Sequence, residues 1–266
     1  KMNGLISSLP EVDNCFVLPT SADNGVSFGS AILHVAQVDP KSKVLNKTFT
    51  PYLGPSFSSD TILETLKEAK ITKFKKYSDT GKLCKDIAKL IAEGKIIGWF
   101  QGRLEVGARA LGNRSILANP AFPEMKDKIN RDVKRREYFR PFAPSILEKF
   151  SNVWFDFDTQ SNYKFIHKYM LQASQARTIA KEKTPAIVHT DNSVRPQIVS
   201  AKDNSLYHKL LSEFYKITKV PILLNTSFNV RGEPIVCRPE EALRCFISHG
   251  LDILVMENIV LTKEDF

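Results

Sequence analysis

Lys95-Ile-Ile-Gly-Trp-Phe100 is a continuous apolar run of strand length, and it leads directly into Gln101-Gly-Arg-Leu-Glu-Val-Gly-Ala-Arg-Ala-Leu-Gly-Asn-Arg-Ser115. The first run predicts a buried strand. The second, called the arginine loop below, alternates glycines with arginines. Glycine lets the backbone come close to a ligand, and arginine offers a planar fork of N–H donors that matches phosphate or carboxylate oxygens. We therefore expect an anion site at the end of this strand.

Two further segments repeat this chemistry, Arg136-Glu-Tyr-Phe-Arg-Pro-Phe-Ala-Pro-Ser145 and Asn225-Thr-Ser-Phe-Asn-Val-Arg-Gly-Glu-Pro234. Ser227 and Asn229 alternate along an extended stretch, so their side chains should lie on the same side. Together the three segments predict one pocket for a phosphorylated or nucleotide-like ligand. The glycine spacing matches neither a Walker loop nor a dinucleotide fingerprint. For the arginine loop, the alternative is an ordinary surface loop whose arginines pair with Glu105 and Glu137.

The composition is that of a globular protein: 266 residues, 42% hydrophobic and 25% charged, with a formal net charge of +9. Such a charge suits nucleic acid, an acidic membrane surface or a polyanionic small molecule. The densest basic block, 126–136, could equally be a solvated helix face or an anion site. No apolar run approaches the roughly 18 residues of a membrane helix, and no signal peptide is visible. Four scattered cysteines without a Cys-x-x-Cys pair favour a reducing cytoplasm.

Hydrophobic periodicity divides the rest of the chain into helices and strands. We expect a mixed α/β or α+β domain rather than a Rossmann unit, because the two kinds of element do not alternate strictly. A polar stretch over 40–60 predicts a linker. Helices are expected at about 28–36, 59–69, 79–93 with Gly94 as cap, 205–217 and 239–248. Strands are expected at 15–18, 95–100, 115–118, 142–147, 220–224, 253–256 and 259–261, with a hairpin formed by 186–189 and 197–200.

Two weaker signals remain. Around the expected hairpin turn lie His189, Asp191, Arg195 and Gln197, although a histidine that ends an apolar strand more often packs or caps than catalyses. Asp23 precedes a predicted helix, where an aspartate normally serves as an N-cap.

These segments resemble the C-terminal part of the carbamoyltransferase family that includes nodulation and antibiotic O-carbamoyltransferases. The resemblance covers nearly the whole chain. It implies a YrdC-like domain over 51–266, a twisted open sheet with flanking helices. It also implies that 1–50 is the remnant of an actin-like ATPase-type metal-binding domain with its linker. The matching residues are Gly102-Arg103, Glu105, Gly107, Arg109-Ala-Leu-Gly112, Arg114-Ser-Ile116, Phe139-Arg-Pro-Phe-Ala-Pro144, His189, Asp191, Arg195-Pro-Gln197, Asn225-Thr-Ser-Phe-Asn229 and Gly232-Glu-Pro234.

The family resemblance implies that the YrdC-like part makes carbamoyl adenylate from carbamoyl phosphate and ATP, with Mg²⁺ on the phosphates. The other domain then passes the carbamoyl group to an acceptor hydroxyl. The phosphate and carbamoyl oxygens are assigned to Arg103, Arg109, Arg114 and Arg140. Nucleotide or substrate contacts are assigned to His189, Asp191, Arg195, Gln197, Asn225, Ser227, Asn229 and Arg231. Asp23 becomes a ligand of iron or a similar divalent metal, in place of an N-cap.

The chain departs from the family pattern in two places. The histidine pair that completes the metal site would lie upstream of residue 1, so we expect weak metal binding and no complete transfer without an N-terminal domain in cis. Asn192 stands where the family usually has glycine, and asparagine tolerates the left-handed backbone that such a turn needs.

The sequence leaves two alternative functions. A basic YrdC-like module could bind RNA, but the aromatics near the arginines, Trp99, Phe100 and Phe142, follow strand patterns and should be buried. A hydrogenase-maturation-type carbamoyltransferase would carry zinc-finger cysteines, and the scattered cysteines argue against it.

Overall fold

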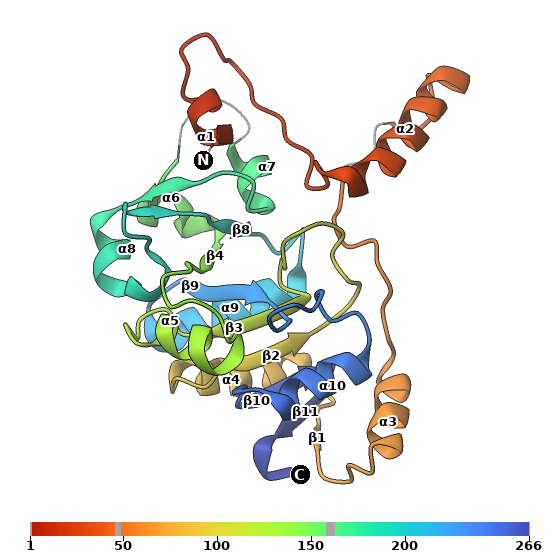
Figure 1. Ribbon diagram of the computed structural model, residues 1–266, viewed down its shortest axis with the longest axis vertical. Helices are drawn as coiled ribbons and strands as arrows, with labels where there is room; N and C mark the ends of the chain where they lie inside the picture. The colour runs from red at the N-terminus through yellow and green to blue at the C-terminus, as the bar shows by residue number, and fades with distance from the viewer. Residues whose placement is uncertain (1, 46–48, 158–162, 266) are drawn as a thin grey trace.

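The structure, a computed structural model, describes residues 2–45, 49–157 and 163–265. Residues 46–48 of the expected linker lie outside these ranges. The centre of the described structure is a twisted mixed sheet of eight strands in the order β1-β11-β10-β2-β3-β9-β4-β8 (Figure 1). The strands are β1 (Lys75–Lys76), β2 (Ile97–Phe100), β3 (Arg114–Ala118), β4 (Ala143–Leu147), β8 (Gln197–Val199), β9 (Ile222–Ser227), β10 (Ile253–Met256) and β11 (Ile259–Thr262). The mixed α/β architecture is confirmed.

The register of the central strands brings the arginine loop and the third basic segment together. β2 lies parallel to β10 and antiparallel to β3, with Phe100 opposite Arg114. β3 in turn lies antiparallel to β9, with Ser115 opposite Ser227. The arginine loop therefore connects two adjacent central strands, and its far end meets the Ser227 segment directly. The predicted strands at 95–100 and 220–224 are confirmed as β2 and β9.

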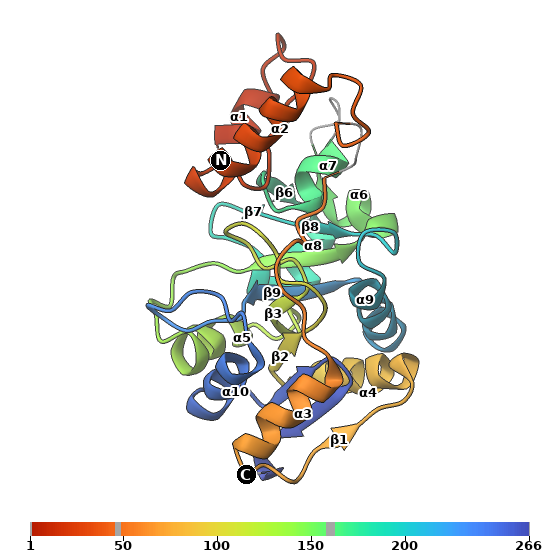
Figure 2. The same ribbon diagram turned by 90° about the vertical axis from the view of Figure 1, so that its right-hand side faces the viewer.

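Helices cover both faces of the main sheet. On one face α4 (Thr80–Ala92) and α9 (Ser205–Thr218) pack against each other, and on the other α10 (Pro239–Ser248) packs on β10 and β2 (Figure 2). α3 (Ser59–Glu68) contacts α10. The Asp79 side chain caps α4 by accepting the Gly81 N–H at 2.7 Å, and Gly94 follows that helix with φ 88°. The predictions for these four helices are confirmed.

The predicted hairpin of 186–189 and 197–200 is wrong. A second sheet contains β5 (Phe155–Asp156), β6 (Ser174–Ala176) and β7 (Ser193–Val194), whereas β8 joins the main sheet parallel to β4. The segment 185–187 forms a 3₁₀ turn that begins at Pro185, because proline fixes φ and lacks an N–H for strand pairing. The chain thus crosses from one sheet to the other at Arg195. Short helices flank the small sheet: α6 (Ser151–Trp154), α7 (Tyr163–Lys168) and α8 (Thr178–Lys183).

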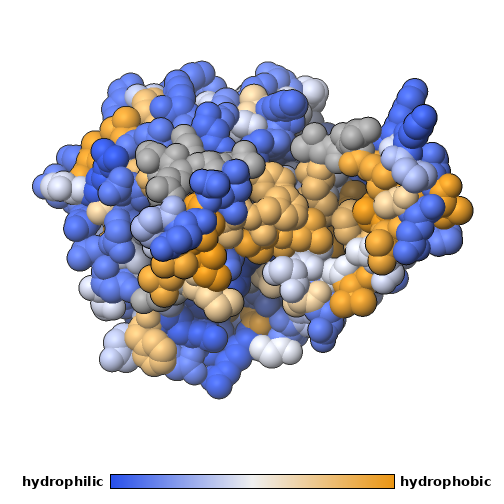
Figure 3. Space-filling view, turned by 90° about the horizontal axis from the view of Figure 1, so that it is seen from above, coloured by the Kyte–Doolittle hydropathy of each residue, from blue (hydrophilic) through white to orange (hydrophobic). Residues whose placement is uncertain are grey.

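The N-terminal part lies along the body and then stands away from it (Figure 1). It contains α1 (Met2–Ser7), a 3₁₀ turn over Asp23–Gly25 and α2 (Val26–Val38), which confirms the first predicted helix. The predicted strand at 15–18 is wrong. Phe16 is 69% exposed and its ring stacks on Phe165 at 5.1 Å, and no described strand pairs with this run. Hydrophobic surface follows the arm that carries α2 and continues on the body beside it (Figure 3).

The basic block 126–136 is not simply a solvated helix face. α5 (Met125–Lys128) continues into a π-helical turn, Ile129–Val133. This turn buries Asn130 completely and leaves Lys134 only 4% exposed. Single π turns inside helices are frequent at functional sites.

Trp99, Phe100 and Phe142 are buried in the core, as predicted. None of the helices in the described parts of the chain is long and apolar enough to cross a bilayer.

Candidate functional site

The arginine loop is organised around the carboxylate of Glu105. Its Oε1 accepts the backbone N–H groups of Leu111 at 2.8 Å, Asn113 at 2.7 Å and Arg114 at 3.2 Å. Glu105 is 4% exposed, and burial raises the pKa of its carboxyl group. From the sequence, Glu105 was expected to be a motif residue or an ion-pair partner of arginine. The structure instead makes it the acceptor that closes the loop.

Side chains from neighbouring strands hold the carbonyl groups of the same loop. Gln197 Nε2 donates to Leu111 O at 2.8 Å, and Asn225 Nδ2 donates to Ala110 O at 3.3 Å. Asn225 Nδ2 also donates to Ser145 Oγ at 3.0 Å, so β9, β4 and β8 share one buried polar network. Gln197 and Asn225 were assigned to substrate contacts. Their amide donors point to the loop, and the substrate role stays a prediction.

Two of the predicted arginines use their donors on backbone oxygens. Arg114 is fully buried, and its Nη1 donates to Gln101 O at 2.7 Å while its guanidinium lies 3.6 Å from the centre of the Phe100 ring. Burial lowers its pKa to about 10. Arg103 is exposed and donates to Leu53 O at 2.7 Å. These hydrogen bonds fix the start of the loop. Direct contact of either arginine with a ligand stays a prediction.

Arg109 and Arg195 face one open cavity of about 550 Å³ together with Asp23. The N-terminal segment, the tip of the arginine loop and the 170–173 segment supply the rest of its wall. Burial and then the positive charge of Arg109 lower the pKa of Arg195 to about 10. Among the described residues, the buried Nε of Arg195 has no hydrogen-bond partner, and Arg109 makes no ion pair. Two guanidinium groups on one cavity are the donors that suit an oxyanion, and the anion-binding role of both arginines stays a prediction.

A second cluster lies where β9 ends. Lys134 Nζ donates to Asn229 Oδ1 at 2.7 Å and to Asn229 O at 3.0 Å, and it also contacts both oxygens of Ser227. The Ser227 hydroxyl donates to Asn229 Oδ1 at 2.7 Å, which confirms that the two side chains share a side. Burial, followed by the charge of Arg136, lowers the pKa of Lys134 to about 7. Lys134 was not singled out from the sequence, which placed it only within the helically spaced basic block 126–136, because the π turn that buries it cannot be read from that spacing.

The remaining arginines gather beside this cluster. Arg140 lies 3.7 Å from Glu137. The ion pairs considered from the sequence, between the arginines of the arginine loop and Glu105 or Glu137, are not among those of the described residues. Arg231 and Arg136 also lower the pKa of Glu137, after its own backbone N–H and Arg140, so all four charges are neighbours. Buried Asn130 holds this loop by donating to Arg140 O at 2.9 Å. The anion-binding roles of Arg140 and Arg231 stay predictions.

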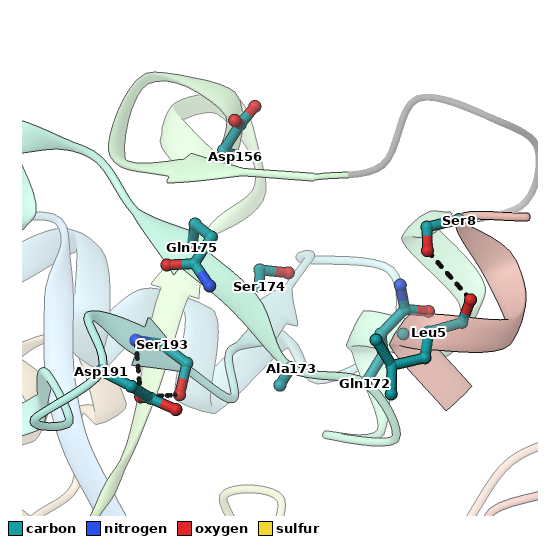
Figure 4. Close-up of a pocket in the computed structure, with 10 residues that line it drawn as sticks. Leu5, Ser8, Asp156, Gln172, Ala173, Ser174, Gln175, Asp191 and Ser193 are labelled. Carbon is teal, nitrogen blue, oxygen red and sulfur yellow. Dashed lines mark hydrogen bonds between the residues drawn. The ribbon is translucent and has the colours of Figure 1, made fainter. Parts of the chain in front are cut away.

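His189 and Asp191 form a tight turn beside a separate pocket. His189 Nδ1 lies 3.1 Å from Ser193 Oγ, which donates to Asp191 Oδ1 at 2.6 Å. Asn192 has φ 61°, the left-handed conformation expected from the sequence. The pocket, of about 410 Å³, lies between this turn, β6 and α1 (Figure 4). Gln172 and Ala173 line both this pocket and the arginine cavity, so the two are adjacent.

Asp23 does not act as an N-cap, because Ala22 holds that position and no side chain caps the turn. Within 2–45, 49–157 and 163–265, no three His, Cys, Asp or Glu side chains gather to hold a metal ion. The described residues therefore do not fit a resident metal centre, and no chemical step is derived through one.

Comparison with known proteins shows which family this chain matches. A family model for the carbamoyltransferase C-terminus matches residues 88–263. The chain is 37% identical to an uncharacterized protein of Synechocystis sp., over 98% of this chain and 45% of that protein. It is 36% identical to the nodulation protein NolNO of Sinorhizobium fredii, over 98% of this chain and 38% of that protein. The chain thus spans less than half the length of these relatives.

Among solved structures, it is similar to full-length HypF in its phosphate- and nucleotide-bound form. That similarity has a TM-score of 0.47 and 18% identity, covering 73% of this chain and 22% of that one.

Proposed function

Because the chain belongs to the carbamoyltransferase family, we propose that it forms carbamoyl adenylate from carbamoyl phosphate and ATP. The balanced reaction consumes one water: carbamoyl phosphate, ATP and water give carbamoyl adenylate, phosphate and pyrophosphate. The new bond joins a carbamate oxygen to the α-phosphorus of ATP, and pyrophosphate leaves. The carbamoyl group is then available for an acceptor hydroxyl.

The observation that carries this proposal is that Arg109 and Arg195 border one cavity and neither forms an ion pair with another described residue, including Asp23 on the same wall. The charge of Arg109 lowers the pKa of Arg195, whereas burial alone lowers the pKa of Arg109. An anion bound between the two guanidinium groups would favour the charged form of both. The carbamoyl phosphate or carbamate oxygens are the anion of the right size. A guanidinium pair can also bind a second oxyanion as pyrophosphate forms.

We propose that the nucleotide binds at the Lys134 cluster. Ser227 and Asn229 offer a hydroxyl and an amide, and Lys134 adds a positive charge at their side. The β3–β9 register puts this cluster at the end of the arginine loop that carries Arg109. Both reactants would therefore border the same loop, one at its tip and one at its end.

Catalysis in this proposal is electrostatic. The transition state spreads negative charge over phosphate oxygens, and fixed positive groups stabilise it without reorganising at the moment of reaction. Mg²⁺ would enter with the ATP phosphates as part of the substrate. No described side chain is required as a covalent nucleophile.

Transfer to the acceptor is proposed to involve protein beyond the described residues. The relatives are more than twice as long as the matched region, and the α2 arm exposes apolar side chains such as Leu33, which is 59% exposed. We propose that 1–50 belongs with a metal-binding domain in cis, in which Asp23 is one ligand, and that 51–266 forms the adenylating domain.

The test is carbamoyl-phosphate-dependent exchange of labelled pyrophosphate into ATP. Arg109→Ala should reduce exchange at least about 100-fold, as expected when a charged group stabilising the transition state is lost. Arg244→Ala removes an exposed arginine on α10 and serves as the matched control with unchanged exchange. Wild-type exchange in Arg109→Ala would remove the arginine cavity from the reaction.

A further inference from the structure

The tip of the arginine loop is held only through its two ends. Before the tip, Val106 N donates to Pro51 O at 2.7 Å. After the tip, the N–H groups of Leu111, Asn113 and Arg114 all converge on Glu105 Oε1. Between these anchors, Gly107, Ala108 and Arg109 donate no backbone hydrogen bond to another described residue. The position of Arg109 therefore depends on how the loop is closed.

Closing the loop with Glu105 has an energetic cost, because burial disfavours the charged form of a carboxylate. A carboxylate buried to 4% exposure normally needs a charged partner, yet no ion pair joins Glu105 to another described residue. Its charge acts on the buried Arg114 without a direct contact between the two charged groups, and opposes the lowering of that arginine's pKa by burial. Its second oxygen, Oε2, is buried without a hydrogen-bond partner in the described structure. Three N–H donors on one oxygen favour the charged form, and burial opposes it. A buried carboxylate with three donors on one oxygen and none on the other is a local exception of the kind that is expected at functional sites.

A charged acceptor also holds the loop more firmly than a neutral one would. An ionised carboxylate oxygen accepts stronger hydrogen bonds than a neutral amide oxygen does. The loop carbonyls of Ala110 and Leu111 are meanwhile held from the other side by Asn225 and Gln197. The peptide groups directly after Arg109 are thus fixed from both sides.

We propose that Glu105 is a positioning residue, whose buried carboxylate fixes the arginine loop so that Arg109 faces Arg195 across the anion cavity. This inference rests on the proposed function for its catalytic readout. Glu105 touches no reacting atom, and its effect passes through Arg109. It follows that removing Glu105 should matter for the anion that Arg109 binds and much less for the nucleotide at Lys134.

The test is a double-mutant cycle in the full-length protein with Glu105→Gln and Arg109→Ala. Glu105→Gln keeps the shape and one acceptor oxygen and removes the charge. We expect it to raise KM for carbamoyl phosphate about tenfold or more, with KM for ATP changed less than twofold. In the Arg109→Ala background the same substitution should change neither constant, because coupled residues are non-additive. An equal loss in both backgrounds, or equal effects on the two substrates, would overturn the proposal.

A second measurement needs no variant. Hydrogen exchange of the wild-type protein should show the amides of Leu111 and Asn113 strongly protected and those of Ala108 and Arg109 exchanging fast. Fast exchange at Leu111 and Asn113 would contradict the proposal even if Glu105→Gln fails to fold.

Failure of the proposed function gives a different result. If wild-type protein shows no carbamoyl-phosphate-dependent exchange, the adenylation claim fails. The affinity of the same four proteins for inorganic phosphate is then measured by calorimetry. Glu105→Gln should still weaken phosphate binding only when Arg109 is present.

Discussion

At the scale of single residues, environment separates arginines that look alike in the sequence. Arg109 and Arg114 stand in one glycine-rich motif, five residues apart. Arg114 is fully buried and donates to backbone carbonyls, whereas Arg109 borders a cavity with Arg195. The first arrangement builds the loop, and the second is available to an anion. Substitution of a buried arginine should therefore lower stability, whereas substitution of an arginine on the cavity should weaken anion binding.

Arg195→Ala should weaken carbamoyl phosphate binding while leaving the fold intact. Loss of one hydrogen-bonded charge contact is worth roughly 1.5–3 kcal/mol, or about 10- to 150-fold in Kd. Arg114→Ala should instead lower the free energy of unfolding by about 3 kcal/mol, because several buried carbonyls lose their donor. Calorimetric titration and urea unfolding of both variants distinguish the two roles. A destabilised Arg195→Ala with normal binding would contradict the assignment.

Lys134 makes nucleotide binding sensitive to pH. Its pKa in the free protein is about 7, so the ammonium form is lost as pH rises through that value. Bound phosphates favour the ammonium, so the affinity for ATP should fall from pH 6 to pH 8.5, by at most about tenfold per pH unit. The Lys134→Met variant should bind ATP more weakly, with an affinity that is nearly independent of pH. Substitution of the exposed Lys67 by methionine should leave the affinity and its pH dependence as in the wild type. A wild-type affinity that stays constant over this range would remove Lys134 from the nucleotide site.

At the scale of secondary-structure elements, the arginine loop depends on the helix packed behind it. Gly112 has φ 102°, and a Cβ there would lie 2.2 Å from Cδ1 of Tyr207 in α9. A side chain at this position is both strained and in collision.

Gly112→Ala should therefore lower the free energy of unfolding by about 2–4 kcal/mol. It should also reduce carbamoyl-phosphate-dependent exchange, because the loop after Arg109 must move. Gly232→Ala is the control, since φ 80° is strained there but nothing lies within 4 Å of its Cβ. Thermal unfolding of the pair separates collision from strain. Equal melting temperatures would show that the Tyr207 contact is not tight.

The sequence predicted strongly periodic elements and missed those set by distant contacts. α4, α9 and α10 follow from apolar spacing and capping residues such as Asp79. The run at 186–189 was misread because four apolar residues do not reveal their neighbours, and Pro185 decides the local geometry. Arg109, Ser227 and Asn229 were identified as candidates from local motifs. Lys134 was not, because a π turn and a contact across 95 residues place it beside Asn229.

At the scale of the whole molecule, the fold brings two basic clusters to one loop between two central strands. The cavity of Arg109 and Arg195 lies at the loop's tip, and the Lys134 cluster lies at its end. If both reactants bind along this loop, each should favour the other by ordering it. We expect ATP and carbamoyl phosphate together to raise the melting temperature by more than the sum of their separate shifts, because binding to the folded state adds stability. Strictly additive shifts in a thermal scan would mean that the two clusters act independently.

The most direct test of the adenylation proposal is isothermal titration of the protein with ATP and Mg²⁺, with and without carbamoyl phosphate. The account predicts ATP binding that Asn229→Ala weakens strongly, and an additional carbamoyl-phosphate-dependent heat that Arg109→Ala strongly reduces. Absence of both heats with a well-folded wild-type protein would contradict it. Heats unchanged in both variants would place the reaction away from these residues.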